Sequence, residues 1–123
     1  MRFLTLLIIV FINSVCCAQQ AEFSFEHKSH RWPNTAEGPI LEHVFQFTNK
    51  GEIPLIIESY DVACTCTKVI YPKTPILPGE SGEIQVNFDT KGKIAWQNRT
   101  ILIHSNSKSS PDKLRIKVQV ENP

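Results

Sequence analysis

The chain has 123 residues, with 13 lysines and arginines against 12 aspartates and glutamates, so its formal net charge is +1. Basic and acidic residues are interspersed without blocks, which argues against a nucleic-acid-binding protein and against docking on an anionic membrane. No apolar run approaches the roughly 20 residues that a membrane-spanning helix needs. The sequence therefore predicts no nucleic-acid partner and no transmembrane segment.

Residues 1–18 have the pattern of a secretory signal peptide. Arg2 supplies a positive start, residues 4–12 form a short apolar run, and Ala18 is a small residue suited to cleavage. We expect cleavage after Ala18 and an exported protein, either periplasmic or extracellular. A lipid anchor at Cys16 or Cys17 is the alternative. Neither cysteine, however, is preceded by the apolar residue and small residues that usually come before a lipidated cysteine.

Residues 19–123 are long enough for one domain and contain short segments in which apolar and polar residues alternate. We expect strands at 23–25, 41–49, 55–60, 68–71, 83–88, 99–106 and 114–120. Prolines and glycines mark 32–39 and 72–82 as connections. This pattern predicts an all-β fold, an immunoglobulin-like antiparallel β-sandwich of about seven strands, with a closed barrel as the alternative.

Cys64 and Cys66 stand one residue apart and are the only cysteines beyond the predicted leader. They can be reduced structural thiols, which behave as small apolar side chains. They can form a disulfide, but only across a local turn, because alternate residues of an extended strand lie about 7 Å apart at Cα. They can also hold Cu(I), which prefers thiolate ligands. All three interpretations stay open at this point.

The histidines do not complete a metal site with these cysteines, because their spacing matches no known zinc pattern. The four are His27, His30, His43 and His104. His43 alternates with Phe45, so we expect it in the core or at a sheet edge, and we expect His27 and His30 in solvent near a turn. The sequence predicts no bound metal and no cofactor.

Groups for catalysis are not evident in the sequence. No serine lies in a Gly-x-Ser-x-Gly turn, and Glu80 and Glu83 lie in or beside a proline-rich connection, where charged residues are usually solvated. Trp32 and Trp96 fall in or beside predicted loops, and we expect each to cap an open end of the sandwich. These observations predict a protein without catalytic activity.

Five runs of residues, in order along the chain, together resemble a known family. They are HVFQFTNKG at 43–51, PLII at 54–57, CTCT at 64–67, ILPGESG at 76–82 and VNFDT at 86–90. The chain resembles the exported bacterial domain-of-unknown-function family 1573, which is similar to the modules named for abnormal spindle, SPD-2 and hydin proteins. The resemblance implies a seven-stranded immunoglobulin-like sandwich and a bacterial exported protein, and it implies no established activity.

Members of that family often carry Cys-Gly-Cys-Thr where this chain has Thr65 between its cysteines. A β-branched threonine resists backbone angles that glycine adopts freely, which argues against a tight turn here. We expect an immunoglobulin-like binding module of the bacterial cell envelope, whose partner is an unidentified envelope protein or peptide taken up at an exposed sheet edge. The alternative function is a thiol redox or Cu(I)-handling protein that uses Cys64 and Cys66.

Overall fold

The computed structural model describes residues 19–122. The predicted leader, the cleavage after Ala18 and the alternative lipid anchor at Cys16 or Cys17 lie outside the described residues. Nine strands follow one another: β1 (Phe23–Phe25), β2 (Ser29–Arg31), β3 (Thr35–Ala36), β4 (Ile40–Asn49), β5 (Ile57–Val62), β6 (Thr67–Ile70), β7 (Ser81–Asp89), β8 (Ala95–Ser105) and β9 (Asp112–Glu121). Within residues 19–122 there is no helix of the length and apolar character that crossing a membrane requires.

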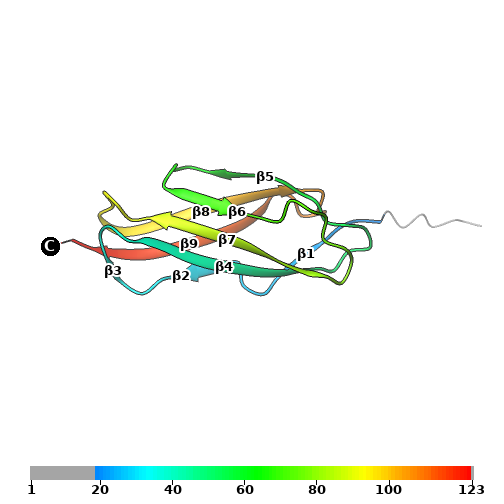
Figure 1. Cartoon of the computed structure of the whole chain (residues 1–123), viewed down its shortest axis with the longest axis horizontal. Helices are drawn as coiled ribbons and strands as arrows, with labels where there is room; N and C mark the ends of the chain where they lie inside the picture. The colour runs from blue at the N-terminus through cyan, green and yellow to red at the C-terminus, as the bar shows by residue number, and fades with distance from the viewer. Residues whose placement is uncertain (1–18, 123) are drawn as a thin grey trace, which may run out of the picture.

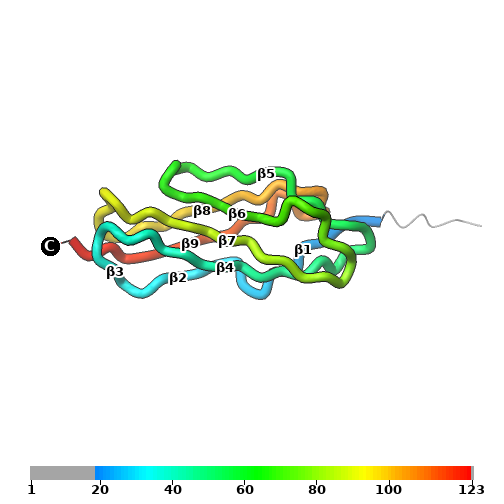
Figure 2. The backbone as a smooth tube through the Cα atoms, in the orientation of Figure 1, coloured from blue at the N-terminus to red at the C-terminus, as the bar shows by residue number. Residues whose placement is uncertain are grey.

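The strands form two sheets that pack face to face and run along the long axis of the molecule (Figure 1). One sheet has the order β1–β4–β7–β6, and the other has the order β2–β9–β8–β5 with β3 also paired to β9. The two ends of the described chain lie at opposite ends of the long axis (Figure 2). The predicted all-β immunoglobulin-like sandwich is confirmed, and the strands form two sheets as a sandwich requires.

The core lies between the sheets and is built by strict alternation along the long strands. Phe45 and Phe47 of β4, Ile84 to Phe88 of β7 and Leu114 to Val120 of β9 place every second side chain inward. Outward neighbours on the same strands are polar or partly exposed. This period of two is what the sequence pattern predicted.

Strands β2 and β3 were not expected, because we predicted a turn and a loop there. Both pair in parallel with β9, with Ser29 opposite Arg115 and Thr35 opposite Val120. Pro33 separates them, since proline has no N–H to donate to a ladder. Segments this short carry no measurable hydrophobic period, so only the tertiary pairing reveals them.

Asn49, at the end of β4, ties four backbone segments together. Its side-chain amide donates to the carbonyls of Ile53 at 2.8 Å and Ile76 at 2.9 Å. Its carbonyl oxygen accepts from the N–H of Gly51 at 2.9 Å and of Glu22 at 3.3 Å. Asn49 is 0% exposed, so these four bonds satisfy the polar groups of a fully buried side chain.

Candidate functional site

Cys64 and Cys66 lie in the connection between β5 and β6, and the structure joins them in a disulfide. Their Cα atoms are 5.1 Å apart, shorter than the spacing of alternate residues in an extended strand. The required turn is present, because the N–H of Thr67 donates to the Cys64 carbonyl at 3.1 Å. Of the three interpretations, the structure contains the disulfide, which leaves no free thiolate for Cu(I) in this state.

The turn forms although Thr65, and not a glycine, stands between the two cysteines. Among the described non-glycine residues only Ala95 has a positive φ, so Thr65 keeps an ordinary backbone conformation. A β-branched residue is compatible with such a turn, and the objection drawn from the sequence does not hold here.

The disulfide turn leads directly into β6 and fixes where that strand begins. The carbonyl of Cys66 accepts a hydrogen bond of 2.9 Å from the N–H of Asp89, which continues the ladder between β6 and β7 by one residue. The half-buried Cys66 also packs against the core. The cysteine pair therefore positions an edge strand, which is a structural role.

We expect the Cys64→Ser/Cys66→Ser double variant to fold and to lose about 1 to 2 kcal/mol of unfolding free energy. The loop closed by this disulfide is only three residues long, so opening it returns little conformational entropy to the unfolded chain. Urea denaturation of the variant and of the reduced wild-type protein measures the change, and the two curves should agree. A loss above about 4 kcal/mol would contradict this account.

Three histidines lie near one another where β2 approaches β4, at the open side of the sandwich. The rings of His30 and His43 are stacked with centroids 3.6 Å apart, and His43 also meets the edge of Phe45. Burial lowers the pKa of His30, and burial followed by the charges of His30 and His27 lowers the pKa of His43. His30 and His43 are both half-buried, so His30 is less solvated than we expected, and His27 is exposed.

These lowered pKa values predict that acid destabilises the fold. The folded state holds His30 and His43 neutral at a pH where the unfolded chain, with histidine pKa values near about 6.5, begins to bind protons. Their contribution to stability is therefore complete above that pH and is lost as the pH falls below it. We expect the melting temperature to fall between about pH 7 and pH 5, and less so in His30→Gln/His43→Gln.

The control for this pH experiment is His104→Gln, because His104 lies outside the stack and hydrogen-bonds Asp61 at 2.5 Å. That variant should keep the acid-induced decrease. If the melting temperature falls equally steeply with acid in the wild type and in His30→Gln/His43→Gln, the stacked histidines are not the source of the acid-induced decrease.

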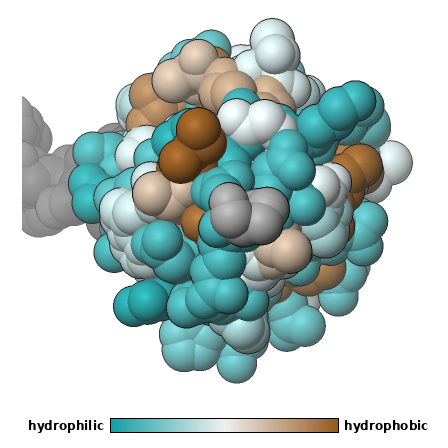
Figure 3. Space-filling view, turned by 90° about the vertical axis from the view of Figure 1, so that its left-hand side faces the viewer, coloured by the Kyte–Doolittle hydropathy of each residue, from teal (hydrophilic) through white to brown (hydrophobic). Residues whose placement is uncertain are grey.

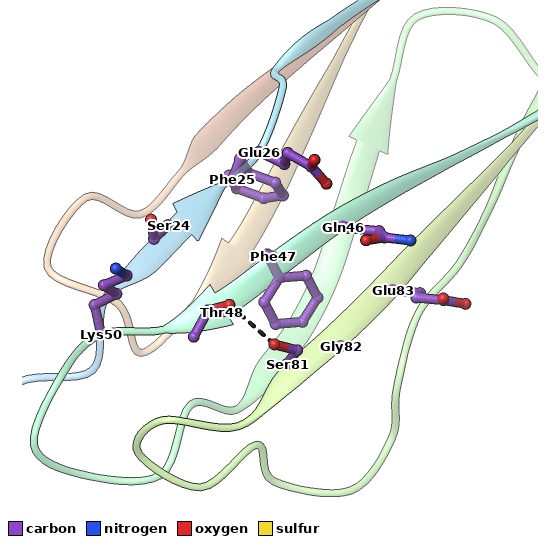
Figure 4. A pocket seen from close by; sticks show the side chains of 10 residues that line it. All are labelled: Ser24, Phe25, Glu26, Gln46, Phe47, Thr48, Lys50, Ser81, Gly82 and Glu83. Atoms are coloured by element: carbon purple, nitrogen blue, oxygen red, sulfur yellow. Dashed lines mark hydrogen bonds between the residues drawn. The ribbon is translucent and has the colours of Figure 1, made fainter.

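An open trough of about 520 Å³ lies over β1, β4 and β7 (Figure 4). Its lining includes the hydroxyls of Thr48 and Ser81, 2.9 Å apart, and the carboxylate of Glu83. No histidine or cysteine is among its lining residues. Across residues 19–122, no three His, Cys, Asp or Glu side chains come together in a geometry that holds a metal ion.

The sheet edges are the remaining candidates, and β6 is the edge strand that the disulfide turn leads into. β6 pairs with β7 on one side only. Since Cys66 bonds to Asp89 and antiparallel bonding alternates, the backbone groups of Lys68 and Ile70 face β7 and those of Val69 face away from it. The outward-facing Ile70 is 52% exposed beside this edge.

Two of the other edge strands are shorter, and the six-residue β5 has an irregular register and a side chain bonded to its backbone. β1 and β2 have three residues each. β5 has an irregular register between Ile57 and Ser59, and the hydroxyl of Tyr71 donates to the Glu58 carbonyl at 3.1 Å. Irregular register and side-chain caps are common ways to protect an edge from pairing. An exposed edge is expected from the sequence, but no local pattern of residues identifies which strand forms it.

Comparison with solved structures supports the fold. A protein of unknown function from Porphyromonas gingivalis W83 superposes with a TM-score of 0.73 at 17% identity, over 89% of this chain and 51% of that one. The seventh PapD-like (ASH) domain of human CEP192 gives 0.65 at 11% identity, over 85% and 88%. The secreted serine protease VesC of Vibrio cholerae gives 0.61 at 13% identity, over 80% and 23%.

These identities show a shared fold alone, and the chain spans about half the length of the Porphyromonas protein. No curated protein matches the chain. A family model described as "Protein of unknown function (DUF1573)" matches residues 23–120, which include both sheets and the disulfide turn. The chain therefore belongs to the DUF1573 family of immunoglobulin-like domains.

Proposed function

We propose that the chain is an exported binding module of the bacterial cell envelope that takes up an extended segment of another envelope protein by strand addition at β6. The immunoglobulin-like fold and membership of DUF1573 support a module of this kind. The signal-peptide pattern of residues 1–18 supports export, and one of the fold neighbours is itself a secreted protein. The proposal assigns no catalytic activity to the chain.

The observation that carries the proposal is the unpaired outer side of β6. An edge strand offers a row of N–H and C=O groups to an incoming segment, and main-chain hydrogen bonds then supply affinity. On β6 these are the N–H and C=O of Val69 together with the C=O of Thr67, because the Thr67 N–H is already used by Cys64. The disulfide turn holds the beginning of this strand in place.

Side chains next to the edge add a preference for an apolar segment. Ile70 is 52% exposed, and Val44, two strands away across Gln85, is 39% exposed on the same outer face. An added strand beside β6 would place alternate side chains on that face. We therefore expect a partner segment with an apolar residue opposite Ile70.

Photo-cross-linking in cells of the source bacterium tests the proposal. A cross-linking amino acid at Lys68 of β6 should give one protein adduct, whereas the same group at Lys91, in the turn after β7, should give none. Adding Val69→Pro removes the outward N–H and should abolish the adduct. Val69→Ala keeps that N–H and should preserve it.

Val69 is buried, so the unfolding curve of each variant must show that it remains folded. An adduct of equal yield at Lys91, or one that survives in folded Val69→Pro, would overturn strand addition at β6. A protein adduct that persists at Lys68 in the Cys64→Ser/Cys66→Ser variant is expected, since the proposal uses the cysteines only to position the strand.

A further inference from the structure

Four basic side chains gather on the outer face of the second sheet. Lys113, Arg115 and Lys117 alternate along β9 with the buried residues Leu114 and Ile116, so all three point away from the core. Arg31 of β2 lies beside Lys117 in the parallel register and joins them. The sequence showed no basic block because every second residue of this stripe is apolar.

The charges of this face are not neutralised within the molecule. The ion pairs among the described residues join Lys28 to Asp112, His104 to Asp61 and Lys108 to Glu22, and none of them includes the four cations. Among residues 19–122, the strands of this sheet bring acidic residues to this face only at its margins, as Asp61 opposite Leu102 and Glu121 at the end of β9. Unpaired cations grouped in this way attract a polyanion.

An exposed tryptophan lies at one end of the stripe. Trp96 of β8 is 44% exposed, and the guanidinium of Arg31 lies 4.9 Å from its ring centroid. The expectation that Trp96 only caps an end of the sandwich is therefore wrong. Stacking on an aromatic ring orients a guanidinium, whose planar fork then binds a carboxylate through two parallel hydrogen bonds.

The rest of the face carries hydrogen-bonding side chains. Asn98 lies opposite Lys117, Thr100 opposite Arg115, and Gln119 opposite Trp96. The end of the sandwich nearest Trp96 is also largely hydrophilic, with only scattered hydrophobic residues (Figure 3). A protein interface is normally more apolar at its centre, and a single-stranded nucleic acid is normally held by several stacked aromatics.

We propose that this face binds a linear acidic polysaccharide whose uronate carboxylates lie along β9. The hydroxyls of such a polymer suit Asn98, Thr100 and Gln119, and a sugar ring suits the exposed Trp96. Cations at positions two apart on β9 recur about every 7 Å, which allows one chain to contact several of them. The face is built by β2, β9 and β8, away from β6, so it does not depend on the proposed strand addition.

Binding of polygalacturonate tests this inference, with protein produced from the whole 123-residue sequence. Titration calorimetry and Trp fluorescence are recorded at 50 and 150 mM NaCl. We expect saturable binding that weakens with salt, and at least about a tenfold loss of affinity in Lys113→Gln/Arg115→Gln/Lys117→Gln. Neutral dextran should not bind.

The matched control is Lys50→Gln/Lys68→Gln/Lys91→Gln, which removes the same charge from residues outside this face and should keep most of the affinity. Trp96→Ala should weaken polygalacturonate more than poly-L-glutamate, because both lose the oriented Arg31 guanidinium but only the polysaccharide loses the contact between a sugar ring and the indole. Absence of binding at 50 mM NaCl, or an equal loss in the control triple variant, would overturn the assignment. Poly-L-glutamate or single-stranded DNA bound as tightly as polygalacturonate would overturn it in favour of an acidic protein or a nucleic acid.

Discussion

Asn49→Ala is expected to lower the unfolding free energy by about 3 to 5 kcal/mol. The fully buried Asn49 side chain satisfies the carbonyls of Ile53 and Ile76 and the N–H groups of Gly51 and Glu22. Truncation leaves the Ile53 carbonyl and the N–H groups of Gly51 and Glu22 without these partners, while the Ile76 carbonyl keeps the N–H of Leu55. Each buried unsatisfied group costs about 1 to 3 kcal/mol if water does not enter. Urea denaturation monitored by circular dichroism measures the loss.

Asn87→Ala is the matched control for this prediction. Asn87 lies on the outer face of β7, where its carbonyl oxygen accepts one hydrogen bond of 3.0 Å from Gln85. We expect it to cost less than about 1 kcal/mol. If Asn49→Ala is no more destabilising than Asn87→Ala, the four hydrogen bonds do not organise this end of the sandwich.

Gly82→Ala is expected to be the second most damaging of these substitutions, at about 2 to 3 kcal/mol. Gly82 pairs with Phe47 across β4 and β7, and a Cβ at Gly82 would lie 2.6 Å from the end of the Phe47 ring. Phe47 is 2% exposed and packs against Phe23 and Phe25, so its ring has little room to move. The new methyl group therefore displaces part of the core.

A double-mutant cycle with Phe47→Leu tests that explanation. The smaller leucine leaves space over Gly82, so the double variant should be more stable than the sum of the two single losses by about 1 kcal/mol or more. Thermal and urea unfolding of all four proteins give the coupling. Strict additivity would show that Gly82→Ala acts through the backbone alone.

The alternation of apolar and polar residues made most of the fold predictable. Residues 84 to 88 and 114 to 120 lie in β7 and β9 with the expected side chains inward. Their hydrophobic period is a local property of the chain, and burial between two sheets follows from it. The prediction from local pattern was wrong at Gly82, which we expected in a connection but which lies in β7. A glycine is needed there because of the Phe47 ring on the neighbouring strand, which the local sequence does not show.

The candidate sites were less predictable because they depend on register between distant strands. The disulfide requires a turn, and a Cys-Thr-Cys sequence gives no signal for one. The stacking of His30 on His43 requires β2 to lie beside β4, which no local pattern predicts. The basic face was missed although Lys113 and Lys117 flank Arg115 at strand spacing, because it is completed by Arg31 from a strand that was not expected. Pairings of this kind are tertiary information.

The central claim is that the edge of β6 receives a strand, and hydrogen exchange at one amide tests it most directly. The partner is the protein identified by cross-linking at position 68. When it is bound, hydrogen exchange of the Val69 amide should slow by about tenfold or more. The amides of Lys68 and Ile70 already face β7, so their exchange should change little. Slowed exchange confined to other strands, with the Val69 amide unchanged in the complex, would contradict strand addition at β6.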